Sequence, residues 1–332
     1  MKILGSYPNV RLRRNRKYNW SRRLVAENNL SVSDLILPIF ITEGKSRIVP
    51  IKSMPGVFRY SIDKLGNIVN QASKLKIPLV AIFPHTPNNK KNSFGSEGLD
   101  EDNLVCRAIR KIKKNNPNIG VMADVALDPY TDHGHDGILK KNEILNDETI
   151  EILSEQALLQ AQMGCDVIAP SDMMDGRVGI IRKTLDKNNF KNVQILSYAA
   201  KYASNFYGPF RNAIGSIKKL KGNKKSYQMD YKNSSEALRE VALDIKEGAD
   251  FVMIKPALPY LDVIKLVKDH FKIPVFGYQV SGEYTMIAQS VKKNILEKDA
   301  ILESLMSIKR AGASAIVTYF AIEVAKRLKN KL

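Results

Sequence analysis

The stretch SEALREVALDIKEGADFVMIK, residues 235–255, contains a helix, its stop and a buried strand in succession. Apolar residues recur with helical spacing over residues 235–247, and Gly248 follows, as a helix stop requires. The apolar run at 251–254 is short and does not alternate with polar residues, which is typical of a strand buried on both faces of a parallel sheet. The stretch therefore predicts one helix–strand unit with Lys255 at the carboxyl end of the strand.

The same pattern recurs along the chain and predicts its fold class. Eight apolar runs predict buried strands, at residues 35–41, 79–83, 119–125, 166–169, 193–198, 250–254, 275–278 and 315–319. Helical patterns between them include residues 102–113, 148–163, 235–247, 260–269 and 299–310. Eight βα units predict an α/β fold of the (β/α)8 TIM-barrel type. The competing doubly wound sheet needs a glycine-rich phosphate loop after an early strand, and the sequence has none.

The barrel is predicted to form a single catalytic domain over residues 33–332, preceded by an extended N-terminal arm at residues 1–32. Active sites of such barrels lie at the carboxyl ends of the strands. Polar residues follow or end seven of the eight predicted strands. They are His85, Asp124 and Asp128, Ser171 and Asp172, Lys201, Lys255, Ser281, and Tyr319. Their convergence on one mouth predicts a site there.

Lys201 and Lys255 indicate the chemistry, because an ammonium group at the end of a buried strand is costly unless it is used. A free lysine titrates near ~10.4 and attacks carbonyls only when burial or a nearby cation favours its neutral form. Two lysines facing one pocket would depress each other's pKa. The alternative for each is a strand-end lysine that reaches solvent. The aromatic and polar residues around both favour imine chemistry on carbonyl substrates.

Composition excludes several classes of protein. The chain has 332 residues, of which 44 % are hydrophobic, so it can bury a sizeable core. No apolar stretch approaches the ~20 residues of a membrane span, and we expect a cytoplasmic protein without membrane contact. Cys106 and Cys165 suit buried thiols. The net charge of +18 is compatible with nucleic-acid binding, but no nucleic-acid motif is present. The arginine-rich start suits either a nucleic-acid tail or a docking arm for another subunit.

Long blocks of the sequence match one family. They are RRNR at 13–16 with Trp20, residues 34–40, 124–137, 169–177, 197–211, 253–256, 259–262 and 278–283. On these blocks the chain resembles 5-aminolevulinic acid dehydratase, also called porphobilinogen synthase, over nearly its whole length. The resemblance implies a lyase of haem and tetrapyrrole biosynthesis that joins two 5-aminolevulinate molecules into porphobilinogen with loss of two waters. Two lysines then match two substrate ketones.

The resemblance also implies roles for single residues. Lys255 corresponds to the lysine that holds the propionate-side substrate, and Lys201 to the one that holds the acetate-side substrate. Arg211 and either Lys224 or Lys225 would bind one carboxylate, where the family commonly has arginine at the second position, and Ser281 and Tyr319 would bind the other. Acid and base candidates are Asp124, Asp128, Ser171 and Asp175. Residues 202–229 resemble a mobile lid over the site.

Metal use is read from the same resemblance. Members that bind catalytic zinc carry three cysteines where this chain has Ala126, Asp128 and Asp136, so the chain resembles the aspartate-rich type and catalytic zinc is not expected. The two aspartates would suit a hard cation such as magnesium, or would orient substrate amines without metal. Glu240 matches a glutamate that helps to bind an allosteric magnesium, with an exposed helical glutamate as the alternative. The arm resembles one that embraces a neighbour in a homo-octamer.

Two other functions stay open from the sequence. A class I aldolase would need one imine lysine and a phosphate site after the seventh and eighth strands, where little glycine-rich backbone is available. A basic nucleic-acid-binding protein on a barrel scaffold is suggested by charge alone, and salt-dependent retention on DNA would favour it.

Overall fold

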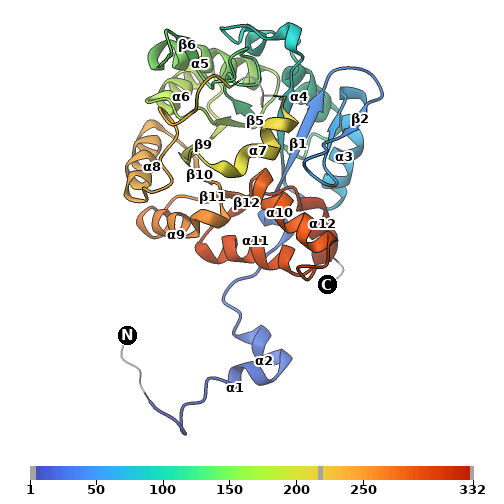
Figure 1. Ribbon diagram of the computed structural model, residues 1–332, viewed down its shortest axis with the longest axis vertical. Helices are drawn as coiled ribbons and strands as arrows, with labels where there is room; N and C mark the ends of the chain where they lie inside the picture. Colours follow the sequence, from blue (N-terminus) through green and yellow to red (C-terminus); the bar gives the residue numbers. More distant parts are fainter. Residues whose placement is uncertain (1–4, 216–219, 330–332) are drawn as a thin grey trace.

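The computed structural model describes residues 5–215 and 220–329. Residues 1–4 of the predicted arm, residues 216–219 of the predicted lid and residues 330–332 lie outside that range. Within it, eight parallel strands form a closed barrel with helices around it, which confirms the predicted (β/α)8 fold (Figure 1). The barrel closes because β12 pairs with β1. The barrel strands are β1 (Leu35–Thr42), β4 (Leu79–His85), β5 (Gly120–Val125), β8 (Val167–Pro170), β9 (Gln194–Lys201), β10 (Phe251–Lys255), β11 (Val275–Tyr278) and β12 (Ala315–Val317).

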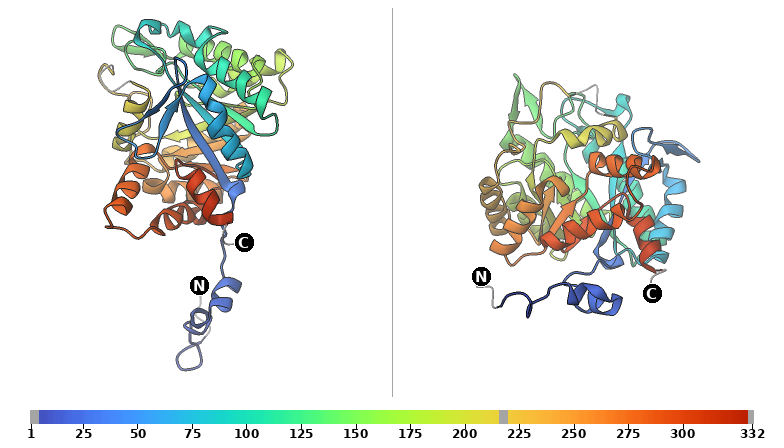
Figure 2. Two further views of the ribbon diagram at one scale, coloured as in Figure 1. Left: turned by 90° about the vertical axis from the view of Figure 1, so that its right-hand side faces the viewer. Right: turned by 60° about the horizontal axis from the view of Figure 1, so that its bottom comes forward.

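The outer layer consists of helices that follow the strands (Figure 2). These are α3 (Ile62–Lys74), α4 (Leu104–Asn115), α5 (Asn146–Gln162), α6 (Arg177–Lys187), α8 (Ser235–Glu247), α9 (Leu261–His270), α11 (Ala300–Ala311) and α12 (Ala321–Lys329). The five helices expected from the sequence are present with ends shifted by two residues or fewer. Helix α8 buries Ala237 and Val241 against the barrel. It ends at Gly248, whose φ of +107° lies in the left-handed region that side chains disfavour.

Additional elements cover the mouth of the barrel. An antiparallel pair, β2 (Ile48–Pro50) and β3 (Phe58–Tyr60), forms a hairpin after β1. Strand β3 also pairs in parallel with the last residues of β1, through Phe40 with Arg59 and Ile41 with Tyr60. The β2–β3 hairpin (residues 48–60) therefore extends the barrel wall at the carboxyl end of β1. Helices α7 (Gly208–Ala213) and α10 (Ser281–Lys292) lie at the same end, and a hairpin of β6 (Ile138–Lys140) and β7 (Glu143–Leu145) precedes α5.

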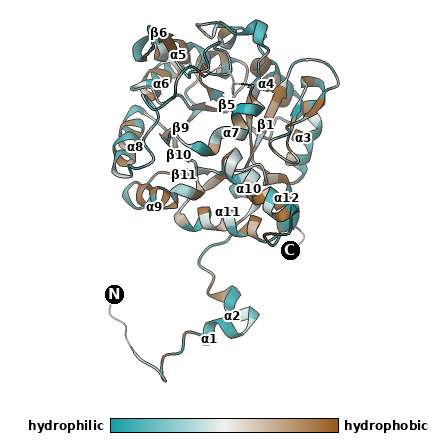
Figure 3. Cartoon of the chain, viewed as in Figure 1, coloured by the Kyte–Doolittle hydropathy of each residue, from teal (hydrophilic) through white to brown (hydrophobic). Residues whose placement is uncertain are grey.

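The N-terminal segment extends away from the barrel (Figures 1 and 2). It contains the short helices α1 (Arg14–Lys17) and α2 (Asn19–Leu24). Large apolar side chains are left exposed on it, including Tyr7 at 75 %, Leu12 at 71 % and Leu24 at 77 %. In Figure 3 this segment is largely hydrophilic with apolar positions between, while the barrel strands are apolar. Over residues 5–215 and 220–329, no helix combines the length and apolarity that crossing a bilayer would need.

Candidate active site

The two lysines singled out from the sequence end neighbouring strands. Lys201 is the last residue of β9 and Lys255 is the last residue of β10, and the two are direct partners in the parallel register of these strands. Both side chains are buried, with 5 % and 6 % of their surface exposed. Both ammonium nitrogens also lie over the ring of Tyr198, at 6.0 Å for Lys201 and 4.9 Å for Lys255. The fold therefore brings two buried amines to one mouth.

Lys255 lies in an aromatic enclosure. Its Nζ is 4.6 Å from the ring centroid of Tyr278, 5.2 Å from that of Phe210 and 5.4 Å from that of Tyr207. Burial, reinforced by the charge of Lys201, lowers the pKa of Lys255 to about 7. An ordinary lysine titrates near ~10.4, so the neutral fraction at pH 7 is raised by about a thousandfold. Lys255 is thus prepared for nucleophilic attack on a carbonyl.

Lys201 is held by polar groups instead. Its Nζ donates to the carbonyl oxygen of Ser171 and, at 3.4 Å, to Oδ1 of Asp136. Burial alone would raise the pKa of Asp136, but the cations Lys201 and Lys224 outweigh it and lower this pKa well below its usual range. Asp136 is therefore ionised at neutral pH and provides a fixed negative charge beside Lys201.

Lys224 reaches into the same cluster. Its Nζ lies 2.6 Å from Oδ2 of Asp136 and 3.2 Å from Oδ2 of Asp128. Burial would lower the pKa of Lys224, but the two carboxylates outweigh burial and raise it. An ammonium group thus lies between Asp128 and Asp136.

Hydrogen bonds join the segment that carries Lys224 to residues of the site. The phenol of Tyr227 donates to Oδ2 of Asp136 at 2.9 Å. The ring of His135 contacts that phenol at 3.0 Å through Nδ1 and the carbonyl oxygen of Lys221 at 2.7 Å through Nε2. The backbone nitrogen of Met229 donates to the carbonyl oxygen of Lys201, which returns the segment to the end of β9. Residues 221–229 are therefore in direct contact with Lys201 and with Asp136.

Asp124 lies among these charges at the end of β5. Burial, followed by the charge of Asp128, raises the pKa of Asp124 to about 6. Its Oδ1 is buried and has no hydrogen-bond partner in the part of the chain that the structure describes. A carboxyl group whose pKa lies near neutrality, with a free oxygen beside two lysines, can give and take a proton.

The residues expected to bind the second carboxylate follow β11 and β12, whereas Lys201 ends β9, on the other side of β10. Oγ of Ser281, at the start of α10, accepts the backbone N–H of Phe210 at 2.9 Å. The phenol oxygen of Tyr319 lies 3.1 Å from that of Tyr278, a wall of the Lys255 enclosure. Arg211, expected to bind the first carboxylate, is on α7 next to Phe210. Ser281 and Tyr319 therefore contact residues of the enclosure around Lys255, and Arg211 lies on the helix that contributes Phe210 to it.

Comparison with known proteins identifies the family. A family model described as Delta-aminolevulinic acid dehydratase matches residues 9–327. The chain is 55 % identical over 323 residues to the delta-aminolevulinic acid dehydratase of Bradyrhizobium diazoefficiens, with 97 % of this chain and 92 % of that relative covered. The chain belongs to the delta-aminolevulinic acid dehydratase family. The member from Methanothermus sociabilis is 50 % identical over 97 % of this chain and 99 % of its own.

A solved structure of the family extends the likeness to three dimensions. The structure is that of delta-aminolevulinic acid dehydratase (porphobilinogen synthase) from Toxoplasma gondii, in complex with the reaction product porphobilinogen. It is similar with a TM-score of 0.95 and 44 % identity, over 97 % of this chain and 92 % of that chain. The family resemblance expected from the sequence blocks is therefore confirmed.

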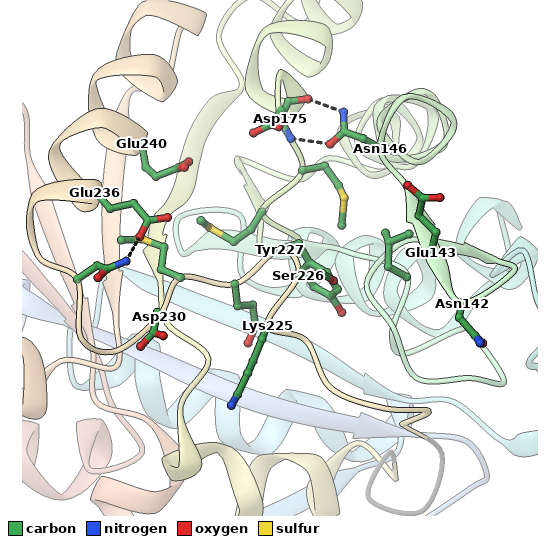
Figure 4. A pocket seen from close by; sticks show the side chains of 16 residues that line it. Asn142, Glu143, Asn146, Asp175, Lys225, Ser226, Tyr227, Asp230, Glu236 and Glu240 are labelled. Atoms are coloured by element: carbon green, nitrogen blue, oxygen red, sulfur yellow. Dashed lines mark hydrogen bonds between the residues drawn. The ribbon is translucent and has the colours of Figure 1, made fainter.

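One of the expected site residues lies elsewhere. Asp175 is exposed, and its backbone is bonded to the side chain of Asn146 on α5. With Glu240 of α8 it lines a cavity of about 570 Å³, which Tyr227 also lines (Figure 4). Glu143, Asp230 and Glu236 also line this cavity. The structure therefore groups Asp175 with the expected magnesium glutamate and not with the two lysines.

Glu240 itself is half-buried, and burial raises its pKa. Over residues 5–215 and 220–329, no group of three His, Cys, Asp or Glu side chains converges as a complete set of metal ligands. A cation in the cavity would therefore keep much of its water, as magnesium commonly does.

Proposed function

We propose that this chain is a porphobilinogen synthase that condenses two 5-aminolevulinate molecules with loss of two waters. The observation that carries the proposal is the pairing of two buried lysines in register, one of which has a pKa lowered to about 7. The family match over residues 9–327 supports the same activity. A class I aldolase would use one such lysine and leaves the second buried amine without a role.

The geometry supports the following division of labour. The neutral amine of Lys255 adds to the ketone of one substrate, and loss of water leaves a protonated imine that withdraws electrons from the neighbouring carbon. Lys201, beside the ionised Asp136, would hold the second substrate in the same way. Asp124 would accept and return protons during both dehydrations, because its pKa is raised to about 6. Both lysine nitrogens leave as free amines when the product forms.

Arg211, Ser281 and Tyr319 stay the proposed receptors for substrate carboxylates. For Lys224, contacts with Asp128 and Asp136 support a second role, which is to balance their charge beside Lys201. We expect no catalytic zinc, because the donors at this site are carboxylates and the two cysteines are buried elsewhere, in α4 and before β8.

Magnesium is proposed as an allosteric ion. Glu240 would hold it in the acidic cavity, with Glu236 and Asp175 bonded to its water ligands. It would supply positive charge that stabilises the packing of α8 beside the loop that follows β8. We further propose that the chain is cytoplasmic. It assembles as a homo-octamer through the N-terminal arm, because the arm's exposed apolar side chains need a partner surface.

Borohydride trapping with 5-aminolevulinate, followed by peptide mapping, tests the function. We expect label on Lys255, with product formation lost in both Lys255→Met and Lys201→Met. The matched control is Lys183→Met, an exposed lysine on α6. Porphobilinogen formation without label on either lysine would refute the imine mechanism, and absence of product from the unmodified protein would refute the activity.

A further inference from the structure

A half-buried arginine on the β2–β3 hairpin has no acidic partner. Arg59 lies on β3, and burial alone lowers its pKa. Within residues 5–215 and 220–329, no carboxylate forms a salt bridge with it. A partly buried cation without a counter-ion costs free energy, so such a residue is commonly kept for a specific contact.

That contact is with the helix that carries Arg211. Nε of Arg59 donates to the carbonyl oxygen of Ala213 at 2.6 Å, and Nη2 donates to that of Asn212 at 2.8 Å. These are the last two residues of α7, and the carbonyl end of a helix favours a cation. Ser53, in the turn of the same hairpin, accepts from the side chain of Asn212 at 3.2 Å. The hairpin therefore holds the end of α7 by side chains 150 or more residues away in sequence.

The other side of α7 is fixed by α10. Ser281 accepts the backbone N–H of Phe210, as described above. A Cβ at Gly282 would lie 2.5 Å from the carbonyl oxygen of Phe206, in the turn just before α7, so glycine allows α10 and this turn to approach this closely. Helix α7 is thus held between α10 and the β2–β3 hairpin. It places the ring centroid of Phe210 5.2 Å from Nζ of Lys255, and Arg211 is the next residue of the same helix.

We propose that Arg59 is a positioning residue, which sets α7 so that Arg211 meets a substrate carboxylate and Phe210 closes the enclosure of Lys255. The inference rests on the proposed function. A plain (β/α)8 barrel does not need the β2–β3 hairpin, and the proposal gives this hairpin a function. The unneutralised charge of Arg59 also adds to the attraction of this side of the mouth for an anionic substrate.

The test is steady-state kinetics of Arg59→Gln with Arg47→Gln as the matched control, because Arg47 is an exposed arginine at the base of the same hairpin. Hydrogen bonds to charged groups support an increase in KM for 5-aminolevulinate of about ten- to a hundredfold in Arg59→Gln, with a smaller change in kcat. Arg47→Gln should match the unmodified protein. Arg59→Lys keeps the charge without the fork of donors, so its KM should lie between the two.

Two further measurements separate positioning from loss of folding. Guanidinium at low millimolar concentration should lower the KM of Arg59→Gly, because the free cation can occupy the space of the deleted group, and should leave Arg47→Gly unchanged. Thermal unfolding should shift little for Arg59→Gln relative to Arg47→Gln. An unchanged KM in Arg59→Gln, or a KM increase that Arg47→Gln shares, would overturn the proposal. Lack of turnover by the unmodified protein would instead refute the proposed function.

Discussion

Lys201→Met removes a cation that helps to keep the amine of Lys255 neutral, so imine formation at Lys255 should need a higher pH. Burial is the largest cause of the low pKa of Lys255, and the charge of Lys201 is the second. Two unit charges about 5–10 Å apart interact by about 2–3 kcal/mol at an effective dielectric constant of about 20. Because one pKa unit corresponds to about 1.4 kcal/mol, we expect the pKa of Lys255 to rise by about 1–2 units.

The sign follows from which form reacts. Lysine attacks a carbonyl as the neutral amine, which predominates above its pKa. In the unmodified protein the rate of imine formation should therefore rise through about pH 7. In Lys201→Met the midpoint should move to about pH 8–9, and the rate at pH 7 should fall by about five- to fiftyfold.

The assay is single-turnover trapping with 5-aminolevulinate and cyanoborohydride over a range of pH, read as the labelled fraction of the peptide that contains Lys255. Lys183→Met, which removes an exposed lysine of α6, should leave the midpoint unchanged. A midpoint in Lys201→Met that stays in place, or moves to lower pH, would refute the electrostatic coupling of the two amines.

Three other predictions follow from the contacts described. Tyr227→Phe removes the phenol hydroxyl that joins His135 to Asp136, so KM for 5-aminolevulinate should rise by about fivefold or more while the far-ultraviolet circular dichroism spectrum stays the same. An unchanged KM would show that this hydroxyl does not hold residues 221–229 in place. Glu240→Gln should abolish stimulation by magnesium after chelation, whereas Glu155→Gln, on the exposed face of α5, should keep it; rescue of the chelated protein by zinc alone would overturn the metal assignment. Deletion of residues 1–29 should reduce the assembly mass in analytical ultracentrifugation, and an unchanged mass would exclude the arm from assembly.

The barrel could be predicted from the sequence because its strands are buried on both faces. Each becomes a short, continuous apolar run, and glycine often marks the helix end before it, as Gly248 does. The β2–β3 hairpin and α7 lack such a signal. Residues 48–50 are exposed, and α7 has only six residues, so neither shows a periodicity that differs from a loop. Their positions depend on partners far away in sequence.

The same distinction applies to the site. Lys201 and Lys255 were predictable because Lys255 directly ends an apolar run and Lys201 closely follows another, and strand order then makes them neighbours. Asp175 follows the same polar block as Ser171, but the positive φ values of Met173 and Gly176 turn the chain there, and Asn146 holds Asp175 on the outside. The contact between His135 and Tyr227 joins residues 92 positions apart, so only the folded chain shows it.

The shifted pKa values of Lys255 and Asp124 indicate how one pocket can catalyse two dehydrations. Burial moves the pKa of Lys255 down to about 7 and that of Asp124 up to about 6, so both groups change protonation near neutral pH. An amine that attacks must lose a proton, and the hydroxyl that later departs as water must gain one. Because each charge attracts the other, protonated Lys255 favours ionised Asp124, and neutral Lys255 favours protonated Asp124. The amine is thus neutral most often when the acid beside it holds the proton that the leaving water needs.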